Sequence, residues 1–580
     1  MKKLFLLAGL MVGSLGWTEG LDLNGSWEFR FEEGRALAEV AKADFAATDV
    51  IPVPGCYDTM PKWFMKRGTG LYRRTFTLDR AVPNAWLTVE GMGLVGLFML
   101  DGRALGTKAL PYSRLRFETG PLAAGTHTVF AALDNRFDWR QLKIARPYYD
   151  FYLYGGFYHG VSLDFDNRSL RVRTRDYRTG VVEVELVGED VEGEQVLLFD
   201  GRNEVKAAFK DNRATVKVPG FRLWSPETPN LHTVALKSKD AGRPAPTARF
   251  GIRTIEARDK RLWLNGELLY LKGANRHEAH PTFGSATSEA LMLQDIQNLK
   301  ALGGNFFRGA HYPQSQRFLD LCDENGVLVW EESLGWGNGQ PWVDPERKEL
   351  KDRQFQADQL EQTKLMVENS FNHPSVIIFA FLNEFESSEK GWKDLADRMI
   401  DAVKSYDSGR LVSFACNHNS SDICNEKTDI ISFNTYPGWI GSDPGEPDNL
   451  KRLFKEDVDA IVKYHRKRYG DKPIMVSEMG TCGEYGRHDA AGAQWTEEFE
   501  AEYVCDAIET VFANPEIAGF TIWQFTDCRS FHRGGGTVRT KPFAENLAGL
   551  YDGYRRPKLV VTSAVKKAFE KSAAGEKPIK

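Results

Sequence analysis

The chain has 580 residues, of which 42% are hydrophobic and 27% charged, and its formal net charge at pH 7 is −5. This is the composition of an ordinary globular protein, and the length predicts about three or four domains rather than one core. The acidic balance argues against nucleic acid or an anionic membrane as a partner. The seven cysteines are scattered and lack metal-ligand spacing, so neither a disulfide framework nor a metal site is predicted. We expect free thiols, with a Cys416–Cys424 pair left open.

The first residues have the pattern of a signal peptide. Lys2 and Lys3 precede the apolar run LFLLAGLMVGSLGW, which resembles a basic region followed by a hydrophobic region and is too short to span a bilayer. We assign residues 1–19 to this segment, and the cleavage position stays open because no A-x-A sequence is present. The chain is therefore predicted to be exported, either secreted or periplasmic, with no membrane contact after cleavage.

Residues 20–165 and 166–257 are predicted to form two β-sandwich domains. In the first, turn signals such as Asp101-Gly102 recur between apolar segments. In the second, apolar residues alternate with polar ones, for example from Val182 to Leu186, as is typical of half-buried strands. Strand signals at short, regular spacing favour sandwich architecture.

Residues 258–575 change to a pattern of strands alternating with helices. An Asn265-Gly266 turn first predicts a β-hairpin. Helices are predicted from Ser288 to Leu302 and from Ser315 to Asn325. Eight strands with intervening helices fit a (β/α)₈ barrel, in which the carboxyl ends of the strands build the active site. The predicted strands are 268–272, 305–308, 327–330, 376–382, 411–415, 430–434, 473–477 and 519–525.

Polar and aromatic residues stand at or just after the ends of these strands, so they are expected to converge on one face of the barrel. Any one of them has a simpler explanation as a turn residue, but the whole set does not. In chain order the set is His277 after the first strand, Arg308 and His311 at the second, Glu331 and Glu332 at the third, Asn383 and Glu384 at the fourth, Tyr436 at the sixth, Glu478 at the seventh and Trp523 at the eighth.

Glu384 and Glu478 are the candidate catalytic pair, on opposite walls of the predicted barrel. Glu384 ends the apolar strand FAFLN, where a carboxyl is partly desolvated and is a candidate proton donor. Glycosidic cleavage needs two such carboxyls, one protonated to assist the leaving oxygen and one ionised to attack the anomeric carbon. The alternatives are a solvated loop acid for Glu384 and, for either glutamate, a structural ion pair, for instance with Arg308.

Several stretches of the chain resemble glycoside hydrolase family 2, which includes β-galactosidases, β-glucuronidases and β-mannosidases. None is decisive alone, but together they are specific and span nearly all of the predicted mature chain. They are GGFYHGVSL (155–163), LWSPETPNLH (223–232), FGIRTIE (250–256), LKGANRHEAHP (271–281), FFRGAHYP (306–313), NHPSVIIFAFLNE (372–384), KPIMVSEMG (472–480) and GFTIWQF (519–525).

The resemblance implies a jelly-roll sugar-binding-like domain (20–165), an immunoglobulin-like sandwich (166–257) and a TIM-barrel catalytic domain (258–575). It implies that Glu384 is the acid/base and Glu478 the nucleophile of a retaining mechanism. It also implies that a further set of residues binds substrate: Asn383, His277, Arg308, His311, Tyr436, Trp523 and Asn546.

The chain departs from the family pattern at two places. The metal-dependent β-galactosidases of the family have Glu-x-His after the third strand, whereas this chain has Glu331-Glu332-Ser333, so no catalytic magnesium or other cofactor is predicted. The same region is closer to the β-glucuronidase branch. That branch holds the sugar carboxylate with an Asn-x-Lys-Gly sequence, which here is Asn546-Leu547-Ala548-Gly549, without the lysine.

The sequence therefore predicts an exported, retaining, exo-acting β-glycosidase, which takes an oligosaccharide or glycoside substrate. It leaves a homo-oligomer open. Because Ala548 cannot pair with a carboxylate, a neutral, galactose-like sugar is the first expectation. The alternative is a β-glucuronidase or other β-uronidase, with the missing cation supplied by Arg529, Arg533, Arg539 or Lys541. A different class, a non-catalytic carbohydrate-binding protein, is disfavoured because both carboxyls are present. The loop 137–141, with Trp139, is a candidate to reach the barrel mouth from the first domain.

Overall fold

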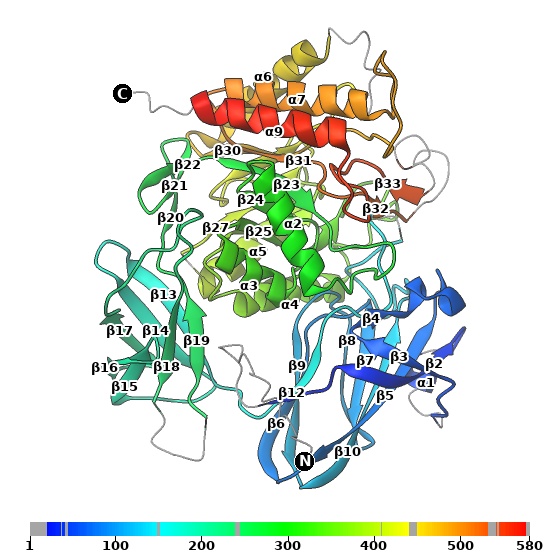
Figure 1. The fold of residues 1–580 in the computed structure, drawn as a ribbon, viewed down its shortest axis with the longest axis vertical. Coiled ribbons are helices and arrows are strands. Elements are labelled where there is room, and N and C mark those ends of the chain that lie inside the picture. The colour runs from blue at the N-terminus through cyan, green and yellow to red at the C-terminus, as the bar shows by residue number, and fades with distance from the viewer. Residues whose placement is uncertain are drawn as a thin grey trace, which may run out of the picture.

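The computed structural model describes residues 20–35, 37–40, 45–147, 151–237, 244–407, 409–439, 449–531, 541 and 544–575. It shows two β-rich domains on different sides of a barrel that is surrounded by helices (Figure 1). The predicted signal peptide, residues 1–19, lies outside the described residues. No helix among the described residues is long and apolar enough to cross a membrane.

The first domain packs two antiparallel sheets around an aromatic core. The sheets have the strand orders β1-β12-β6-β9 and β3-β2-β5-β10-β7-β8. Alternate residues of β2, such as Trp27 and Phe29, point inward and are fully buried. The elements are β1 (Gly20–Asp22), β2 (Gly25–Glu32), α1 (Leu37–Val40), β3 (Asp49–Val53), β4 (Gly55–Cys56), the short 3₁₀ turns Tyr57–Thr59 and Pro61–Trp63, β5 (Thr69–Leu78), β6 (Val82–Val89), β7 (Val95–Leu100), β8 (Arg103–Lys108), β9 (Leu115–Leu122), β10 (Gly125–Asp134), β11 (Gly156–Phe157) and β12 (Val161–Asp164).

The second domain is a smaller sandwich with its own core. Its sheets have the orders β13-β14-β17 and β16-β15-β18-β19. Val182, Val184 and Leu186 are buried on one face of β14, as their alternation predicts. The strands are β13 (Ser169–Asp176), β14 (Val181–Val187), β15 (Gly193–Phe199), β16 (Asn203–Phe209), β17 (Arg213–Lys217), β18 (His232–Leu236) and β19 (Thr247–Phe250).

The third region is a parallel barrel, which confirms the predicted fold class. Its order is β27-β26-β25-β24-β23-β31-β30-β29-β28. β27 and β28 are two parts of one strand, with β27 paired to β26 and β28 paired to β29, so the sheet closes around this break. The strands are β23 (Leu271–Arg276), β24 (Phe306–Gly309), β25 (Leu328–Trp336), β26 (Val376–Asn383), β27 (Leu411–Ser413), β28 (Ala415–Cys416), β29 (Ile431–Asn434), β30 (Ile474–Met479) and β31 (Ile517–Ile522).

Helices cover the outside of the barrel. Both helices predicted by residue range are present: Ser288 caps α2 by accepting from Leu291 N, and Ser315 caps α3 by accepting from Phe318 N. The helices are α2 (Glu289–Ala301), α3 (Gln316–Asn325), α4 (Arg353–Asn369), α5 (Lys390–Tyr406), α6 (Leu450–Tyr469), α7 (Glu497–Ala513) and α9 (Leu559–Gly575). Two further strands, β32 (Cys528–Arg529) and β33 (Glu545–Asn546), pair after β31.

The first and third barrel strands differ most from the sequence prediction. Residues 268–269 belong to a hairpin of β20 (Ile255–Arg258), β21 (Arg261–Leu264) and β22 (Glu267–Leu269), and the first barrel strand begins only at Leu271. The two strands merge in the sequence because only Tyr270 separates them. The third barrel strand continues through Glu331 and Glu332 to Trp336. It lies between β24 and β26, and Glu332 pairs with Arg308 at 2.9 Å.

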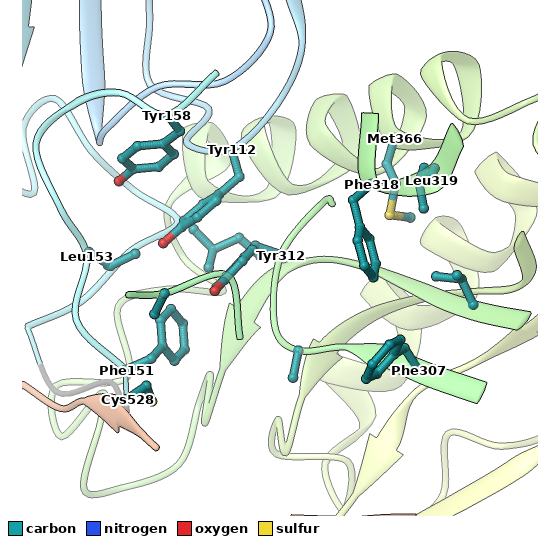
Figure 2. Close-up of a cluster of buried hydrophobic side chains, with 14 of the residues drawn as sticks. Tyr112, Phe151, Leu153, Tyr158, Phe307, Tyr312, Phe318, Leu319, Met366 and Cys528 are labelled. Carbon is teal, nitrogen blue, oxygen red and sulfur yellow. The ribbon is translucent and has the colours of Figure 1, made fainter. Parts of the chain in front are cut away.

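The first domain and the barrel share one hydrophobic cluster (Figure 2). Tyr112 of the first domain stacks on Tyr312 of the barrel, with ring centroids 3.7 Å apart and planes 10° apart. Phe151 of the first domain lies 4.8 Å from the ring of His277. The first domain therefore supports the barrel face that carries the predicted site residues. All seven cysteines are free thiols, including Cys416 and Cys424.

Candidate active site

Arg308, at the end of β24, is the central cation of the site. Its fully buried guanidinium donates to Asn275 Oδ1 at 2.9 Å and to Asn383 Oδ1 at 2.8 Å. It also pairs with Glu332 at 2.9 Å and with Glu478 at 2.5 Å. Burial alone would lower the pKa of Arg308, but the two carboxylates raise it above its ordinary value. The charge of Arg308 is therefore permanent, and it connects three strand ends.

Both carboxylate oxygens of Glu478 are held by donors. Arg308 Nη1 donates to Oε1, and the Tyr436 hydroxyl donates to Oε2 at 2.6 Å. Glu478 lies on β30 and is only 3% exposed. Its carboxylate therefore has a fixed orientation, as a nucleophile requires.

Glu384 follows β26 directly and is half-buried. Its backbone has φ of 53°, a left-handed conformation that non-glycine residues seldom adopt and that is common at functional positions. Asn434 Nδ2 donates to Glu384 Oε1 at 2.8 Å, and Asn434 Oδ1 accepts from Ser477 Oγ at 2.7 Å. Because Ser477 precedes Glu478, two hydrogen bonds connect the strands of the two glutamates.

His277, His311 and Trp523 form an aromatic wall beside Arg308. His311 stacks on Trp523 at 5.3 Å with an interplanar angle of 13°, and His277 meets the same indole edge-on at 5.4 Å. Burial, with the charge of Arg308, lowers the pKa of His311 to about 3. Burial also lowers the pKa of His277 well below its usual range. Both imidazoles are therefore neutral near pH 7, so each has one donor and one acceptor nitrogen.

Four buried polar atoms at these positions have no hydrogen-bond partner among the described residues. They are Nε2 of His277, Nε2 of His311, Nδ2 of Asn383 and Nδ2 of Asn546. Leaving such a group unsatisfied costs about 1–3 kcal/mol, so unsatisfied buried groups are few and call for a functional explanation. Sugar hydroxyls both donate and accept, and they would satisfy all four atoms.

The structure brings together nearly all residues that the sequence singled out. Asn383, His277, Arg308, His311, Tyr436 and Trp523 are connected to the two glutamates by the contacts above. Asn546, on β33, lies beside the end of β31, where Gln524 Nε2 contacts its carbonyl oxygen at 3.4 Å. The catalytic and binding roles of these nine residues stay predictions.

Three supporting residues were not singled out from the sequence. Asn275 donates from Nδ2 to the Ser477 carbonyl at 2.9 Å, and Asn434 orients Glu384. Both stand at the ends of barrel strands, and this position is the sequence signal that could have identified them. Phe151 belongs to a domain whose sequence carried no such signal.

Lys541 is a buried cation close to this site, with 5% of its surface exposed. Its charge contributes to the lowered pKa of His277, which follows β23. It also opposes the effect of burial on Cys482, whose pKa burial raises to about 12. Arg529, by contrast, lies against the first domain, with its guanidinium 4.8 Å from the ring centroid of Phe64 and 5.2 Å from that of Tyr152. Arg533 and Arg539 lie outside the described residues.

Among the described residues, one group has donor atoms spaced to hold a metal ion: Asp320, Asp323 and His373. These atoms already have protein partners. Asp323 bonds to His373 Nδ1 at 2.6 Å and accepts from the backbone of Ser375 at 2.9 Å, while Asp320 pairs with Arg249. The group ties the second domain to the barrel and is not part of the site around Arg308.

The comparison with protein families decides the classification. The model of the glycosyl hydrolases family 2 TIM-barrel domain matches residues 255–566, and a second model of the same family matches residues 160–253. The chain belongs to glycosyl hydrolases family 2.

Its relatives in family 2 include β-glucuronidases and a β-galacturonidase. A β-glucuronidase from Streptococcus agalactiae is 27% identical over 64% of this chain and 62% of that protein. A β-glucuronidase from Paenibacillus borealis is 24% identical over 93% of this chain and 94% of its own length. A family 2 β-galacturonidase structure from Eisenbergiella tayi, bound to glycerol, has a TM-score of 0.82 and 25% identity, covering 96% of this chain and 98% of that one.

Proposed function

We propose that this protein is an exported, retaining β-uronidase that removes a terminal β-linked uronic acid from a glycoside. The support comes from the site geometry and from relatives that are named β-glucuronidase or β-galacturonidase. These relatives favour the uronic-acid alternative over the neutral, galactose-like sugar that Ala548 suggested.

The observation that carries the choice of sugar is the set of uronidase relatives, and Lys541 is the cation that we propose for the sugar carboxylate. A carboxylate enters a buried pocket only if a cation or several donors pair with it, because an unpaired buried charge costs several kcal/mol. Lys541 is buried, and its charge reaches His277. We propose that Lys541 meets the sugar carboxylate from a different position in the chain than the lysine that Ala548 replaces.

The chemistry takes two steps in this proposal. Glu384 protonates the glycosidic oxygen while Glu478 attacks the anomeric carbon, so the carbon–oxygen bond to the leaving group breaks as a glycosyl ester forms. Glu384, now ionised, then takes a proton from water, and the water oxygen attacks the same carbon and releases Glu478. Two inversions give net retention. Arg308 and Tyr436 keep the Glu478 carboxylate aimed at the anomeric carbon in both steps.

A substrate panel tests the proposal. Aryl β-glucuronide, galacturonide, galactoside, glucoside, mannoside and fucoside are compared by kcat/KM. We expect a uronide to be preferred by about 100-fold, which corresponds to about 2.7 kcal/mol of transition-state binding. Preference for any neutral sugar would reject the uronidase assignment. NMR of the first-formed anomer tests retention separately, and initial formation of the α-anomer would contradict the mechanism.

A further inference from the structure

A buried cation stands where the last helix begins. Lys558 directly precedes α9, and its side chain is fully buried. Its ammonium donates to Glu500 of α7 at 3.1 Å and to the buried Asp527 at 3.1 Å. Burial alone would lower the pKa of Lys558, but the two carboxyl groups raise it above its ordinary value. The lysine therefore keeps its charge inside the protein.

The remaining hydrogen bond of the ammonium goes to the backbone of residues 546–549, a segment that begins with the last residue of β33. Lys558 Nζ donates to the Leu547 carbonyl at 2.8 Å, which uses the third of its three donors. Asp527 Oδ1, which accepts from Lys558, also accepts from Gly549 N at 2.8 Å. The ion pair of Lys558 and Asp527 therefore holds segment 546–549 at two points.

This segment also packs closely against the chain that follows β31. Gln524, the residue after Trp523, donates from its backbone N to the Ala548 carbonyl at 2.6 Å. At Gly549 an added Cβ would lie 2.1 Å from a backbone nitrogen of the facing chain, so no side chain fits there. The segment therefore has a fixed position next to Trp523, which belongs to the aromatic wall of the site.

Asn546 begins this segment and has a donor group that the described part of the protein leaves unused. Its side chain is fully buried, and its Oδ1 accepts from Ala548 N at 3.4 Å. Nδ2 has no hydrogen-bond partner among the described residues. A buried N–H group without a partner is costly, so an acceptor on a ligand is the expected partner. Nδ2 therefore suits a hydroxyl or carboxylate oxygen of the terminal sugar.

We propose that Lys558 is a positioning residue, which acts through segment 546–549 to aim Asn546 Nδ2 at an oxygen of the terminal sugar. Asp527 is its partner in this role, because one oxygen of Asp527 meets both the ammonium and Gly549 N. The inference rests on the proposed glycosidase function and on Asn546 as a binding residue, but it does not depend on which sugar is cleaved.

A double-mutant cycle on the preferred glycoside tests the proposal. We expect Asn546→Ala and Lys558→Met each to reduce kcat/KM about tenfold, mainly through KM, in protein that is folded at the assay temperature. The double variant should lose no more than about twofold beyond Asn546→Ala, because Lys558 acts through Asn546. Losses that multiply in the double variant would overturn the proposal. So would a lower melting temperature of Lys558→Met with an unchanged kcat/KM, which is the result for a cluster that only stabilises the fold.

Asp527 supplies a second test that does not need Lys558→Met to fold. Asp527→Asn keeps an oxygen that can accept from Gly549 N, whereas Asp527→Ala removes it. We expect Asp527→Asn to stay within about threefold of the wild-type kcat/KM and Asp527→Ala to lose about tenfold. Equal kinetics of the two variants would contradict the positioning role. Arg253→Met is the matched control for a lost buried cation, because Arg253 donates to the Val376 carbonyl at 2.6 Å, where β26 begins. Its melting temperature should fall while kcat/KM stays the same.

The proposed function can fail while this inference holds. If the wild-type protein cleaves neutral glycosides and no uronide, the uronidase assignment fails, and the same cycle on the preferred neutral glycoside still decides the role of Lys558. If Asn546→Ala has wild-type kinetics on every glycoside that is cleaved, the positioning role is wrong, and the glycosidase function is unaffected.

Discussion

Arg308 and Glu478 form a buried ion pair of 2.5 Å between the second and seventh strands of the barrel, 170 residues apart in sequence. An ion pair that only stabilises the fold would have this same geometry as one that orients a catalytic nucleophile. The pair fixes the position of the carboxylate, and the second oxygen is fixed by Tyr436. Kinetics therefore has to decide the role of Glu478.

Glu478→Gln is expected to abolish turnover, because the amide keeps the shape but is not a nucleophile. The protein should stay folded, because Glu332 still pairs with Arg308, although losing one charge of a buried pair lowers the melting temperature. Glu384→Ala should reduce kcat by about 10²–10⁴-fold for poor leaving groups and much less for activated aryl leaving groups. Azide should restore activity to Glu384→Ala and give a β-glycosyl azide, which NMR identifies. The assignment is wrong if Glu332→Ala is as damaging as Glu478→Ala while Glu384→Ala is silent.

Tyr436→Phe removes the hydroxyl that donates to Glu478 Oε2 at 2.6 Å. A hydrogen bond to a charged group contributes about 1.5–3 kcal/mol, so we expect kcat to fall about 10–100-fold while the protein stays folded. Steady-state kinetics with thermal melting checks both parts. A wild-type kcat would show that Arg308 alone orients the nucleophile.

Lys541→Met should raise KM for the preferred uronide and reduce its kcat/KM by about 100-fold, since the methionine keeps the length of the side chain and removes its charge. Activity toward the matching neutral glycoside should stay the same or rise. Lys206→Met is the control, because Lys206 lies on β16 with 74% of its side chain exposed. Equal losses on charged and neutral substrates would assign Lys541 to folding instead of recognition.

Glu331 predicts a pH dependence of stability. Burial raises the pKa of Glu331 from 4.5 to about 7. The folded protein therefore keeps a proton that the unfolded chain releases between these values, and the stabilisation present below pH 4.5 is lost as pH rises through 7. The loss is at most about 3 kcal/mol. Glu331→Gln should show a smaller drop in melting temperature from pH 5 to pH 8 than the wild type, whereas Glu118→Gln, at an exposed position, should not.

Chelators are expected to leave kcat/KM unchanged, and added Mg²⁺ should not raise it. Glu332 stands in the region where the family's metal-dependent members have their Glu-x-His sequence. It already pairs with Arg308 at 2.9 Å, and a second cation there would be repelled. Dialysis against EDTA followed by assay with and without Mg²⁺ measures this. Loss of activity on dialysis and recovery with a metal would contradict the prediction.

The sequence by itself determined the fold class and was enough to select two glutamates as catalytic candidates. Alternating apolar residues, as from Val182 to Leu186, predict half-buried strands because side chains alternate across a strand. The residues after the apolar run 376–382 mark a strand end, and parallel barrels place all such ends on one face. Residue type and periodicity were therefore sufficient to single out Glu384 and Glu478 as candidates, and their catalytic roles stay predictions. They were not sufficient to place the start of the first barrel strand, because a single residue separates β22 from β23.

Only the tertiary structure decided which side chains meet. Arg308 pairs with Glu478 and Glu332 because barrel closure brings three strand ends together, and no local pattern states that distance. Phe151 reaches His277 from another domain, and Trp139 of the first domain stacks on Phe355 of α4. Lys541 lies near the site, although the family's usual position for this cation holds Ala548. Periodicity reflects only whether a residue faces the core, whereas contacts between distant residues depend on how the domains and the closed barrel pack.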